Sequence, residues 1–476
     1  MKIRIFDAEY TESTNPPWQG NPLIEALTPM LETRVFAHSV TNKPPFDPSE
    51  CLLSNHERLS RLCRVEGLFI PFPHHVTLYQ RIARAICVGY EKRNPVDDPT
   101  SGILSEKVER FSNNLKYGIA PYESESVQGF ALTGISGVGK STAINSVFRL
   151  YPQVLTHREY HGQPLNFRQL VWLKLSCPED GSLKALCISF FKAIDTIFNQ
   201  GFAEKYAKNS YSVAQMVPHF ARVAGLVHLG VLVIDEIQAL SARDSQGRDV
   251  MLGFFTRLAN EIGIPVILVG TPEARTILEG ALQQIRRNSG QGDMMWGAVA
   301  YDQERINNNQ EWTNFAKNLW DYQFVGKKVT YSDELGTGLH SVSQGILGFA
   351  TKIFIVAQER AINNQLEEIT PELLKTVSEQ DFTSAVEKLQ KMFKEKKDGQ
   401  KAPSTVPSPQ PDKPHGQRRS KKPTTLEPES SGPMAQESIG SPEMLQLAKS
   451  QKGAGQSVYT ALEKTEFIKN GREFLE

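Results

Sequence analysis

The chain has 476 residues, 39% of them hydrophobic, and a formal net charge of zero. This length allows two or three domains, and the charge balance alone implies neither a nucleic-acid nor an acidic partner, although a zero sum can hide local patches. Five cysteines without a Cys-x-x-Cys pair argue against a zinc site and indicate free thiols in a reducing cytoplasm. The start, MKIRIFDAEY, lacks the apolar segment of a secretory signal, and no apolar run reaches the roughly 18 residues of a membrane span. We therefore expect a cytoplasmic protein with no membrane partner.

Residues 1–65 alternate turn-forming stretches, such as NPPW and NKPPFDPSE, with short apolar pieces. This pattern predicts an extended N-terminal arm, which is a candidate for binding a partner. After the arm, apolar residues at helical spacing, such as Leu78, Ile82 and Ile86, predict a helix. A second helix is expected near 104–117.

Strands and helices alternate from residue 128 to about 275. Strands are expected at 130–133, 169–177, 231–236 and 265–271, and helices at 140–151, 182–198, 213–227 and 248–262. Fully apolar strands such as VLVIDE are typical of a parallel sheet buried on both faces. The alternation therefore predicts a doubly wound α/β core with a parallel sheet over residues 66–303.

Residues 304–394 are expected to form a helical lid, in which Thr370 caps a helix with Pro371 at its first position. From 395 to 440 the chain is rich in Pro, Ser and Lys and poor in apolar residues. Such a segment cannot bury enough surface to offset its ordering entropy, so we expect a disordered tether. Residues 441–476 regain apolar residues at helical spacing, and they form either a partner-binding segment or a frayed terminal helix.

The segment GISGVGKS matches the phosphate-binding pattern G-x-x-x-x-G-K-[ST] in full and lies between an expected strand and an expected helix. Its glycines let backbone N–H groups turn toward phosphate oxygens, and the positive end of the following helix points at the same oxygens. Lys140 is expected to reach the β- and γ-phosphates, and the Ser141 hydroxyl to ligate magnesium. The alternative is a chance glycine-rich turn. The expected cofactor-binding residues of this loop are Gly134, Ser136, Gly137, Val138, Gly139, Lys140, Ser141 and Thr142.

The strand VLVIDE ends in two carboxylates, which are costly beside a buried strand unless they have a role. Asp235 is expected to hold magnesium through water, and Glu236 to orient and polarise the attacking water. The alternative is an acidic strand end at the surface. A GTPase would need a downstream Asn-Lys-x-Asp motif, and the only Asn-Lys pair, Asn42 and Lys43, lies upstream. The expected cofactors are therefore ATP and Mg²⁺, and the expected activity is that of an ATPase.

Further candidates for nucleotide contact follow these motifs. Thr271 follows the next strand, where ring-type ATPases carry a polar residue that contacts the γ-phosphate. Arg286 and Arg287 end a predicted helix, and one of them would reach the ATP of a neighbouring subunit as a catalytic arginine. The alternative is that they only favour the helix C-terminus as cations. Lys352 opens a lid helix and is either a phosphate contact or a solvated lysine.

Several segments resemble, in order, the TnsC/TniB family of AAA+ transposition regulators, and the longer TnsC type in particular. They are LFIPFPHHVTLYQRIARAICVGYEKRNP, VQGFALTGISGVGKST, QLVWLKLSCPEDGSLKALCISFFKAID, VLVIDEIQAL, ILVGTPEA and QIRRNSGQGD, which lie between residues 66 and 293. The resemblance implies an ATPase that assembles with copies of itself, as a ring or a filament, on double-stranded DNA. It also implies that the protein links a target selector of the TniQ/TnsD kind to a transposase of the TnsA/TnsB kind.

The resemblance carries roles to the matching positions. It implies ATP and magnesium binding for Lys140 and Ser141, a second acidic motif of Asp235 and Glu236, a first sensor at Thr271, and an arginine finger at Arg286 or Arg287. Lids of this family often carry an arginine where this chain offers Lys352. Binding of the selector or the transposase by the two tails is implied by the resemblance alone.

The segment HREYHGQPLNFRQ, residues 157–169, interleaves basic and aromatic residues and is expected to be a loop. Arg158 and His161 in this loop, and Lys184 near a predicted helix N-terminus, are candidates for DNA-phosphate contact. Such contacts need no base readout, because phosphate neutralisation supplies the affinity. An ordinary solvated loop is the alternative.

Functions of different classes remain open. In the first, ATP lies between subunits assembled on DNA, and hydrolysis by Glu236 disassembles them. In the second, a signalling-type P-loop ATPase scaffold binds protein partners without DNA, although such scaffolds usually carry a repeat array and no internal repeat is found here. An origin-type clamp loader is a third alternative, but the winged-helix DNA reader that normally follows its lid is replaced here by the expected disordered tail.

Overall fold

The computed structural model describes residues 4–97, 102–117, 129–275, 292–301 and 310–383. Arg286 and Arg287, the predicted tether at 395–440 and the terminal segment at 441–476 lie outside these residues. Among the described helices, none is by itself long and apolar enough to cross a membrane. One pair bent by 112°, Asp333–Ser343 with Leu347–Asn363, meets the criterion by length and composition only.

A five-stranded sheet forms the centre of the core, with the order β5-β6-β7-β2-β8 and parallel pairing throughout. Its strands are β2 (Phe130–Gly134), β5 (Trp172–Ser176), β6 (Val231–Asp235), β7 (Val266–Gly270) and β8 (Met294–Trp296). Every residue of β2, β6 and β7 is buried, as expected for a parallel sheet covered on both faces. The predicted doubly wound α/β fold is confirmed.

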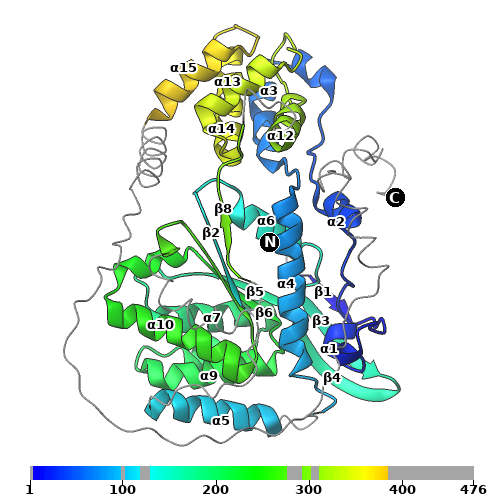
Figure 1. The fold of residues 1–476 in the computed structure, drawn as a ribbon, viewed down its shortest axis with the longest axis vertical. Coiled ribbons are helices and arrows are strands. Elements are labelled where there is room, and N and C mark those ends of the chain that lie inside the picture. Colours follow the sequence, from blue (N-terminus) through cyan, green and yellow to red (C-terminus); the bar gives the residue numbers. More distant parts are fainter. Residues whose placement is uncertain (1–3, 98–101, 118–128, 276–291, 302–309, 384–476) are drawn as a thin grey trace, which may run out of the picture. The chain divides into compact units, whose positions relative to one another are not determined.

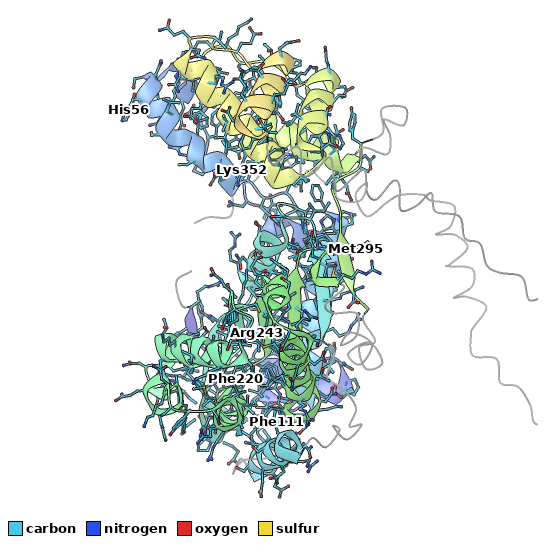
Figure 2. All side chains as sticks on the ribbon, turned by 90° about the vertical axis from the view of Figure 1, so that its left-hand side faces the viewer. His56, Phe111, Phe220, Arg243, Met295 and Lys352 are labelled. Atoms are coloured by element: carbon cyan, nitrogen blue, oxygen red, sulfur yellow. The ribbon has the colours of Figure 1, made fainter. Side chains whose placement is uncertain are left out.

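Helices cover both faces of this sheet (Figure 1). One face carries α5 (Gly102–Tyr117), α7 (Leu183–Phe198), α9 (Val213–Leu226) and α10 (Ser245–Arg257), with the short α8 (Phe202–Tyr206) beside α7. Phe111 of α5 and Phe220 of α9, labelled in Figure 2, belong to an apolar cluster that includes Leu232 and Ile234 of β6.

The opposite face carries α4 (Pro73–Glu91) and α6 (Lys140–Phe148). Phe148 of α6 stacks on Trp172 of β5, with ring centroids 4.7 Å apart and planes inclined by 2°. Because successive side chains of a strand point to opposite faces, Leu173 and Leu175 join the apolar cluster under α7 and α9. Trp172 and Lys174 therefore share the face that α6 covers. This side of the sheet also carries the phosphate-binding loop.

Residues 4–65 do not form the predicted extended arm. They contain β1 (Ile5–Asp7), α1 (Pro22–Glu25), α2 (Thr33–Val40) and α3 (Asn55–Arg61). Leu23 is 0% exposed and Phe36 1% exposed, so this region contributes to the folded core. Proline-rich stretches favour turns and extended chain, but proline is also common at the first position of a helix. At Pro16, Pro22 and Pro48 proline instead begins a short helical turn, which its fixed φ favours.

The predicted loop at 157–169 is also wrong, because this segment is most of a β-hairpin. β3 (Val154–Tyr160) pairs antiparallel with β4 (Gln163–Leu170), and β1 adds to β3 in parallel. The two-residue turn at His161 and Gly162 has φ values of 47° and 78°, as a tight hairpin turn of the primed type requires. The predicted strand at 169–177 is accordingly divided at Val171 between β4 and β5, which lie in different sheets.

Buried polar contacts fasten the N-terminal region to this hairpin. His157 is 1% exposed, and its Nδ1 lies 2.8 Å from the Tyr10 hydroxyl while its Nε2 lies 2.9 Å from Gln169 Oε1. Gln169 donates its own amide to Leu23 O at 2.8 Å, so its Oε1 accepts from His157 and the neutral ring satisfies both contacts. Burial lowers the pKa of His157 to about 4.

The lid consists of α12 (Gln310–Trp320), α13 (Asp333–Ser343), α14 (Leu347–Asn363) and α15 (Pro371–Asp381). Thr370 accepts a hydrogen bond from Leu373 N, which confirms the predicted cap of α15. Residues of the N-terminal region pack on α14 through α3 and the following 3-10 helix, Leu62–Gly67.

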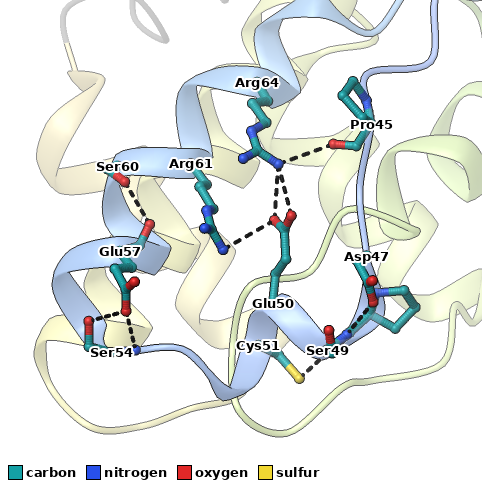
Figure 3. A network of polar contacts seen from close by, with 11 residues as sticks. Pro45, Asp47, Ser49, Glu50, Cys51, Ser54, Glu57, Ser60, Arg61 and Arg64 are labelled. Atoms are coloured by element: carbon teal, nitrogen blue, oxygen red, sulfur yellow. Dashed lines mark hydrogen bonds and ion pairs between the residues drawn. The ribbon is translucent and has the colours of Figure 1, made fainter.

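One ion pair fixes the contact between the N-terminal region and the lid. Arg58, 4% exposed, donates to Glu367 Oε1 and Oε2 at 2.7 and 2.6 Å and to Phe324 O at 3.0 Å. A second network holds the segment around α3 in shape, where Glu50 bridges Arg61 and Arg64 (Figure 3). The N-terminal helix α3 and the lid helix α14 therefore pack in one helical unit, although they are far apart in the sequence.

The buried, neutral His157 predicts acid sensitivity. Below a pH of about 6.5 the unfolded chain binds a proton that folded His157, with its pKa of about 4, does not bind. Stability must therefore fall as the pH falls through this window. We expect this residue to lower the free energy of unfolding by about 1.3 kcal/mol between pH 7.5 and pH 5.5. Urea titrations at the two pH values check this.

In His157→Gln, the pH dependence should shrink by that amount, whatever the absolute stability of the variant. The exposed His56, labelled in Figure 2, provides the matched control His56→Gln. An unchanged pH dependence in His157→Gln would contradict the assignment of a buried neutral ring.

Candidate nucleotide-binding site

The phosphate-binding loop joins the end of β2 at Gly134 to the start of α6 at Lys140, as predicted. Gly137 and Gly139 have φ values of 85° and 93°, in the left-handed region that only glycine adopts readily. A Cβ at Gly134 would lie 2.6 Å from Trp296 O of the neighbouring β8. The loop is therefore shaped by two positive-φ positions and one close backbone approach.

The side chain of Lys140 lies over the loop. Its ammonium donates to Gly134 O at 2.6 Å and to Ile135 O at 3.1 Å. Burial lowers the pKa of Lys140, while the carboxylates of Glu236 and Asp235 act in the opposite direction. A half-buried cation held by the carbonyls of its own loop is placed to exchange them for phosphate oxygens, which are stronger acceptors.

Ser141 and Asp235 meet between α6 and the end of β6. Ser141 Oγ donates to Asp235 Oδ2 at 2.8 Å, and the backbone N of Glu236 donates to Oδ1 at 3.0 Å. The ammonium of Lys174 lies 2.7 Å from the same Oδ2. Burial alone would raise the pKa of Asp235, but the hydrogen bonds from Lys174 and Ser141 outweigh it and lower this pKa. Asp235 is therefore an anion at neutral pH.

These residues fit a magnesium–nucleotide complex. A hydroxyl and a carboxylate that face each other are the oxygen ligands that Mg²⁺ prefers, and the positive-φ glycines leave the loop amides free of Cβ atoms. A bound Mg²⁺ would neutralise phosphate charge. Ser141 and Asp235 would hold the ion, and Lys140 would hold the phosphates.

Gln238 connects the proposed catalytic carboxylate to the proposed sensor. Its amide donates to Glu236 Oε2, and its Oε1 accepts from Thr271 N at 3.1 Å. Glu236 has a φ of 58° and an exposed side chain, so it turns out of β6 into a position that water can reach. The sequence signal, DEIQ, includes this glutamine, but its role follows only from the three-dimensional contact.

The start of the lid helix α14 contacts the loop at Gly137. Gly348 N, at the start of α14, donates to Gly137 O at 3.0 Å. A Cβ at Gly348 would lie 2.9 Å from that oxygen, so glycine permits the approach. Ile346 adds an apolar contact, since its Cγ2 lies 3.1 Å from where a Cβ on Gly137 would stand.

Lys352 lies on α14, as predicted, and is labelled in Figure 2. Its side chain is exposed, and among the described residues it has no hydrogen bond or ion pair to the phosphate-binding loop. Its proposed phosphate contact stays a prediction, as does the role of Arg286 and Arg287, which lie outside the described residues.

The DNA-contact candidates occupy two separate elements. Arg158 is exposed on β3 and pairs with Asp7 at 3.3 Å, and His161 is exposed in the hairpin turn. Lys184 lies in the first turn of α7, where its ammonium donates to Asn209 O at 2.7 Å. Among the described residues, no contact joins Lys184 to the hairpin. His157, counted among the basic residues of the segment, is buried and unavailable to a phosphate.

One comparison with known protein families identifies the nucleotide-binding core. The profile of the AAA domain family matches residues 126–278. A comparison with curated proteins gives no match.

Among solved structures, the chain is similar to the Aeropyrum pernix ORC1 protein in complex with DNA, at 14% identity and a TM-score of 0.36, over 57% of this chain and 64% of that one. It is similar to the Walker-type ATPase paby2304 of Pyrococcus abyssi at 14% identity and a TM-score of 0.33, over 60% and 75%. It is similar to Cdc6p from Pyrobaculum aerophilum at 13% identity and a TM-score of 0.36, over 58% and 66%.

The match spans less than two thirds of the ORC1 and Cdc6p chains, and TM-scores this low carry no argument about function. The family match, the parallel sheet and the complete phosphate-binding loop define a mixed α/β protein with a P-loop AAA+ fold. They support nucleotide binding and ATPase activity in general.

Gln238 should affect hydrolysis more than binding. Replacing it in Gln238→Ala frees Glu236 and removes the acceptor of Thr271 N, while Lys140 and Ser141 stay in place. We expect kcat for ATP hydrolysis to fall about tenfold, because a displaced base is poorly aligned with its water. The dissociation constant of a fluorescent ATP analogue should stay within about twofold.

Steady-state hydrolysis and equilibrium fluorescence titrations measure the two effects, with the exposed Gln380→Ala as control. A parallel loss of binding in Gln238→Ala would mean that this residue shapes the loop rather than positioning Glu236.

Proposed function

We propose that the protein is an ATPase of the TnsC type, which assembles on double-stranded DNA when it binds ATP and disassembles when it hydrolyses ATP. The observation that carries the proposal is the hydrogen bond from Gly348 N to Gly137 O. It joins the lid to the loop that would hold the phosphates, so a change of nucleotide at the loop acts on the position of the lid. A lid that responds to nucleotide is a means by which a subunit can change its fit to its neighbours.

Each step has a residue of this chain assigned to it. Lys140 binds the β- and γ-phosphates, and Ser141 and Asp235 hold magnesium. Glu236 accepts a proton from the attacking water, and Thr271 orients the γ-phosphate end of the site. Glu236 is the general base in this scheme because it is the exposed carboxylate next to Asp235, which is itself engaged by Ser141 and Lys174.

Completion of the site by a neighbouring subunit is part of the proposal. Arg286 or Arg287 would reach the ATP of the next copy and stabilise the charge that develops on the transferred phosphoryl group. Lys352 would add a contact from the lid. Hydrolysis then depends on assembly, and the rate of hydrolysis sets how long the assembled state lasts.

The partner assignments follow from the resemblance to TnsC-type regulators. Arg158, His161 and Lys184 would contact DNA phosphates without reading bases, so binding should weaken with salt. The protein would link a TniQ/TnsD-type selector to a TnsA/TnsB-type transposase. Residues 441–476 are the segment proposed for one of these contacts.

The proposal predicts that Glu236→Gln separates binding from hydrolysis. The amide keeps the size of the side chain but cannot accept the proton, so we expect hydrolysis to fall by about 10²-fold or more with ATP binding retained. Assemblies on duplex DNA should then persist after a chase with excess unlabelled duplex, whereas wild-type assemblies dissociate. Fluorescence anisotropy of labelled duplex in the presence of ATP and magnesium measures this.

Two further variants frame the result. Glu204→Gln, an exposed carboxylate on α8, should behave as wild type. Lys140→Ala should not bind ATP, and ATP should not promote its binding to duplex. If Glu236→Gln bound ATP but no duplex at any nucleotide concentration, the DNA-assembly proposal would fail. A protein-binding scaffold would then be the better account.

A further inference from the structure

Lys174 is a cation on the central sheet whose side chain is only 21% exposed. It follows Trp172 on the side of β5 that α6 covers, where Trp172 stacks on Phe148. The flanking residues Leu173 and Leu175 point to the opposite face, into the apolar cluster. A charge in such a position needs a partner to offset its lost hydration.

The partner of Lys174 is the carboxylate that would hold magnesium. Its ammonium lies 2.7 Å from Asp235 Oδ2, and the two side chains are 21% and 8% exposed. The parallel register of β5 and β6 explains how the Lys174 side chain reaches Asp235. Ser176 lies opposite Asp235 and Lys174 opposite Val233, so the lysine starts two residues before the end of the strand. Its four-carbon stem then carries the ammonium forward to the carboxylate.

One oxygen of Asp235, Oδ2, therefore has two polar partners. Ser141 Oγ donates to Oδ2 at 2.8 Å, and Lys174 occupies the same oxygen. Oδ1 is engaged by the backbone N of Glu236 at 3.0 Å. The face of Asp235 that points toward Ser141, where a hydrated magnesium ion would lie, is thus the face that Lys174 neutralises.

We infer that Lys174 is a tethered cation that competes with Mg²⁺ for Asp235 and so sets the metal concentration at which the nucleotide site fills. Without metal, the ammonium compensates the carboxylate and keeps Asp235 and Ser141 together. Metal binding places a divalent cation beside the same oxygen, and like charges at this distance in a partly buried site repel. Lys174 then leaves Oδ2 and swings toward solvent, to which its side chain is already partly open.

This role differs from that of an ordinary structural ion pair. A structural pair would only stabilise the fold, and its loss would weaken metal binding or leave it unchanged. A competitor has the opposite signature, because its removal strengthens metal binding even if it weakens the fold. The inference rests on the proposed nucleotide site alone and does not require DNA binding or assembly.

The first experiment uses Mn²⁺ as a paramagnetic probe on the full-length, nucleotide-free protein. Water-proton relaxation gives the Mn²⁺ dissociation constant of the wild type and of Lys174→Gln, which keeps a polar side chain and removes the charge. We expect Lys174→Gln to bind Mn²⁺ about tenfold more tightly, because an uncompensated carboxylate attracts the ion and no tethered cation repels it. Lys174→Arg, which keeps the charge, should stay near the wild type.

The control is Lys375→Gln, which removes a lysine that is 70% exposed on α15. It should leave the Mn²⁺ dissociation constant unchanged. The Mg²⁺ concentration for half-maximal binding of a fluorescent ATP analogue should fall in Lys174→Gln to the same degree. Equal or weaker metal binding in a folded Lys174→Gln, judged by circular dichroism, overturns the inference.

A second experiment needs no variant and covers the case in which Lys174→Gln does not fold. Wild-type protein is treated with an amine-acetylating reagent with and without saturating Mg²⁺, and the acetylation of Lys174 relative to Lys375 is measured by mass spectrometry. We expect metal to raise the relative reactivity of Lys174 several-fold, because the ammonium is released from Asp235. Unchanged reactivity with metal bound overturns the inference. If the wild type binds no metal or nucleotide at all, the proposed function itself fails, and that result is distinct.

Discussion

A single backbone hydrogen bond, from Gly348 N to Gly137 O, joins the lid helix α14 to the phosphate-binding loop. The bond needs glycine at both ends. Gly137 has a positive φ, and a Cβ at Gly348 would press on the oxygen that accepts the bond. Because it is a contact of main-chain atoms, it responds to the shape of the loop rather than to a side-chain rotamer. A loop that closes on phosphates changes this contact directly.

The lid also packs on the N-terminal region, so the contact at Gly137 is connected to further parts of the chain. Arg58 binds Glu367 through two hydrogen bonds, and α3 packs on α14. The N-terminal region in turn is held to the β3–β4 hairpin by His157 and Gln169. A continuous series of packed contacts therefore connects α14 to the part of the chain that carries Arg158 and His161.

Asp235 shows how a small number of polar groups sets the chemistry of the site. It accepts hydrogen bonds from Ser141 Oγ and the backbone N of Glu236 and pairs with the ammonium of Lys174, and it remains an anion despite its burial. Glu236, one residue further, lies in a left-handed conformation and is held by Gln238 instead. Adjacent carboxylates thus have different partners, and the proposed function assigns Asp235 to the metal and Glu236 to the attacking water.

Local patterns were enough to predict the core. The glycine-rich loop, the apolar strands β2, β6 and β7, and the cap at Thr370 each depend on neighbours in the sequence, and each was confirmed. The N-terminal helices do not follow from local patterns, because a proline that begins a helical turn and a proline in extended chain look alike in the sequence.

Contacts between distant segments account for the rest. The β3–β4 hairpin lacks a clear alternation of polar and apolar residues in the sequence. His157 is a polar residue that is buried only through its contacts with Tyr10 and Gln169. Lys174, Gln238 and Gly348 could not be assigned from the sequence, since their roles arise from strand register and from contacts with Asp235, Thr271 and Gly137.

The central claim, that ATP controls assembly on DNA, is tested most directly by negative-stain imaging of the full-length protein. Samples would contain a duplex of several tens of base pairs, with and without a non-hydrolysable ATP analogue, at two salt concentrations. The account predicts rings or filaments that require both nucleotide and duplex and become fewer at the higher salt concentration. Bound nucleotide without any such assembly on duplex would contradict it.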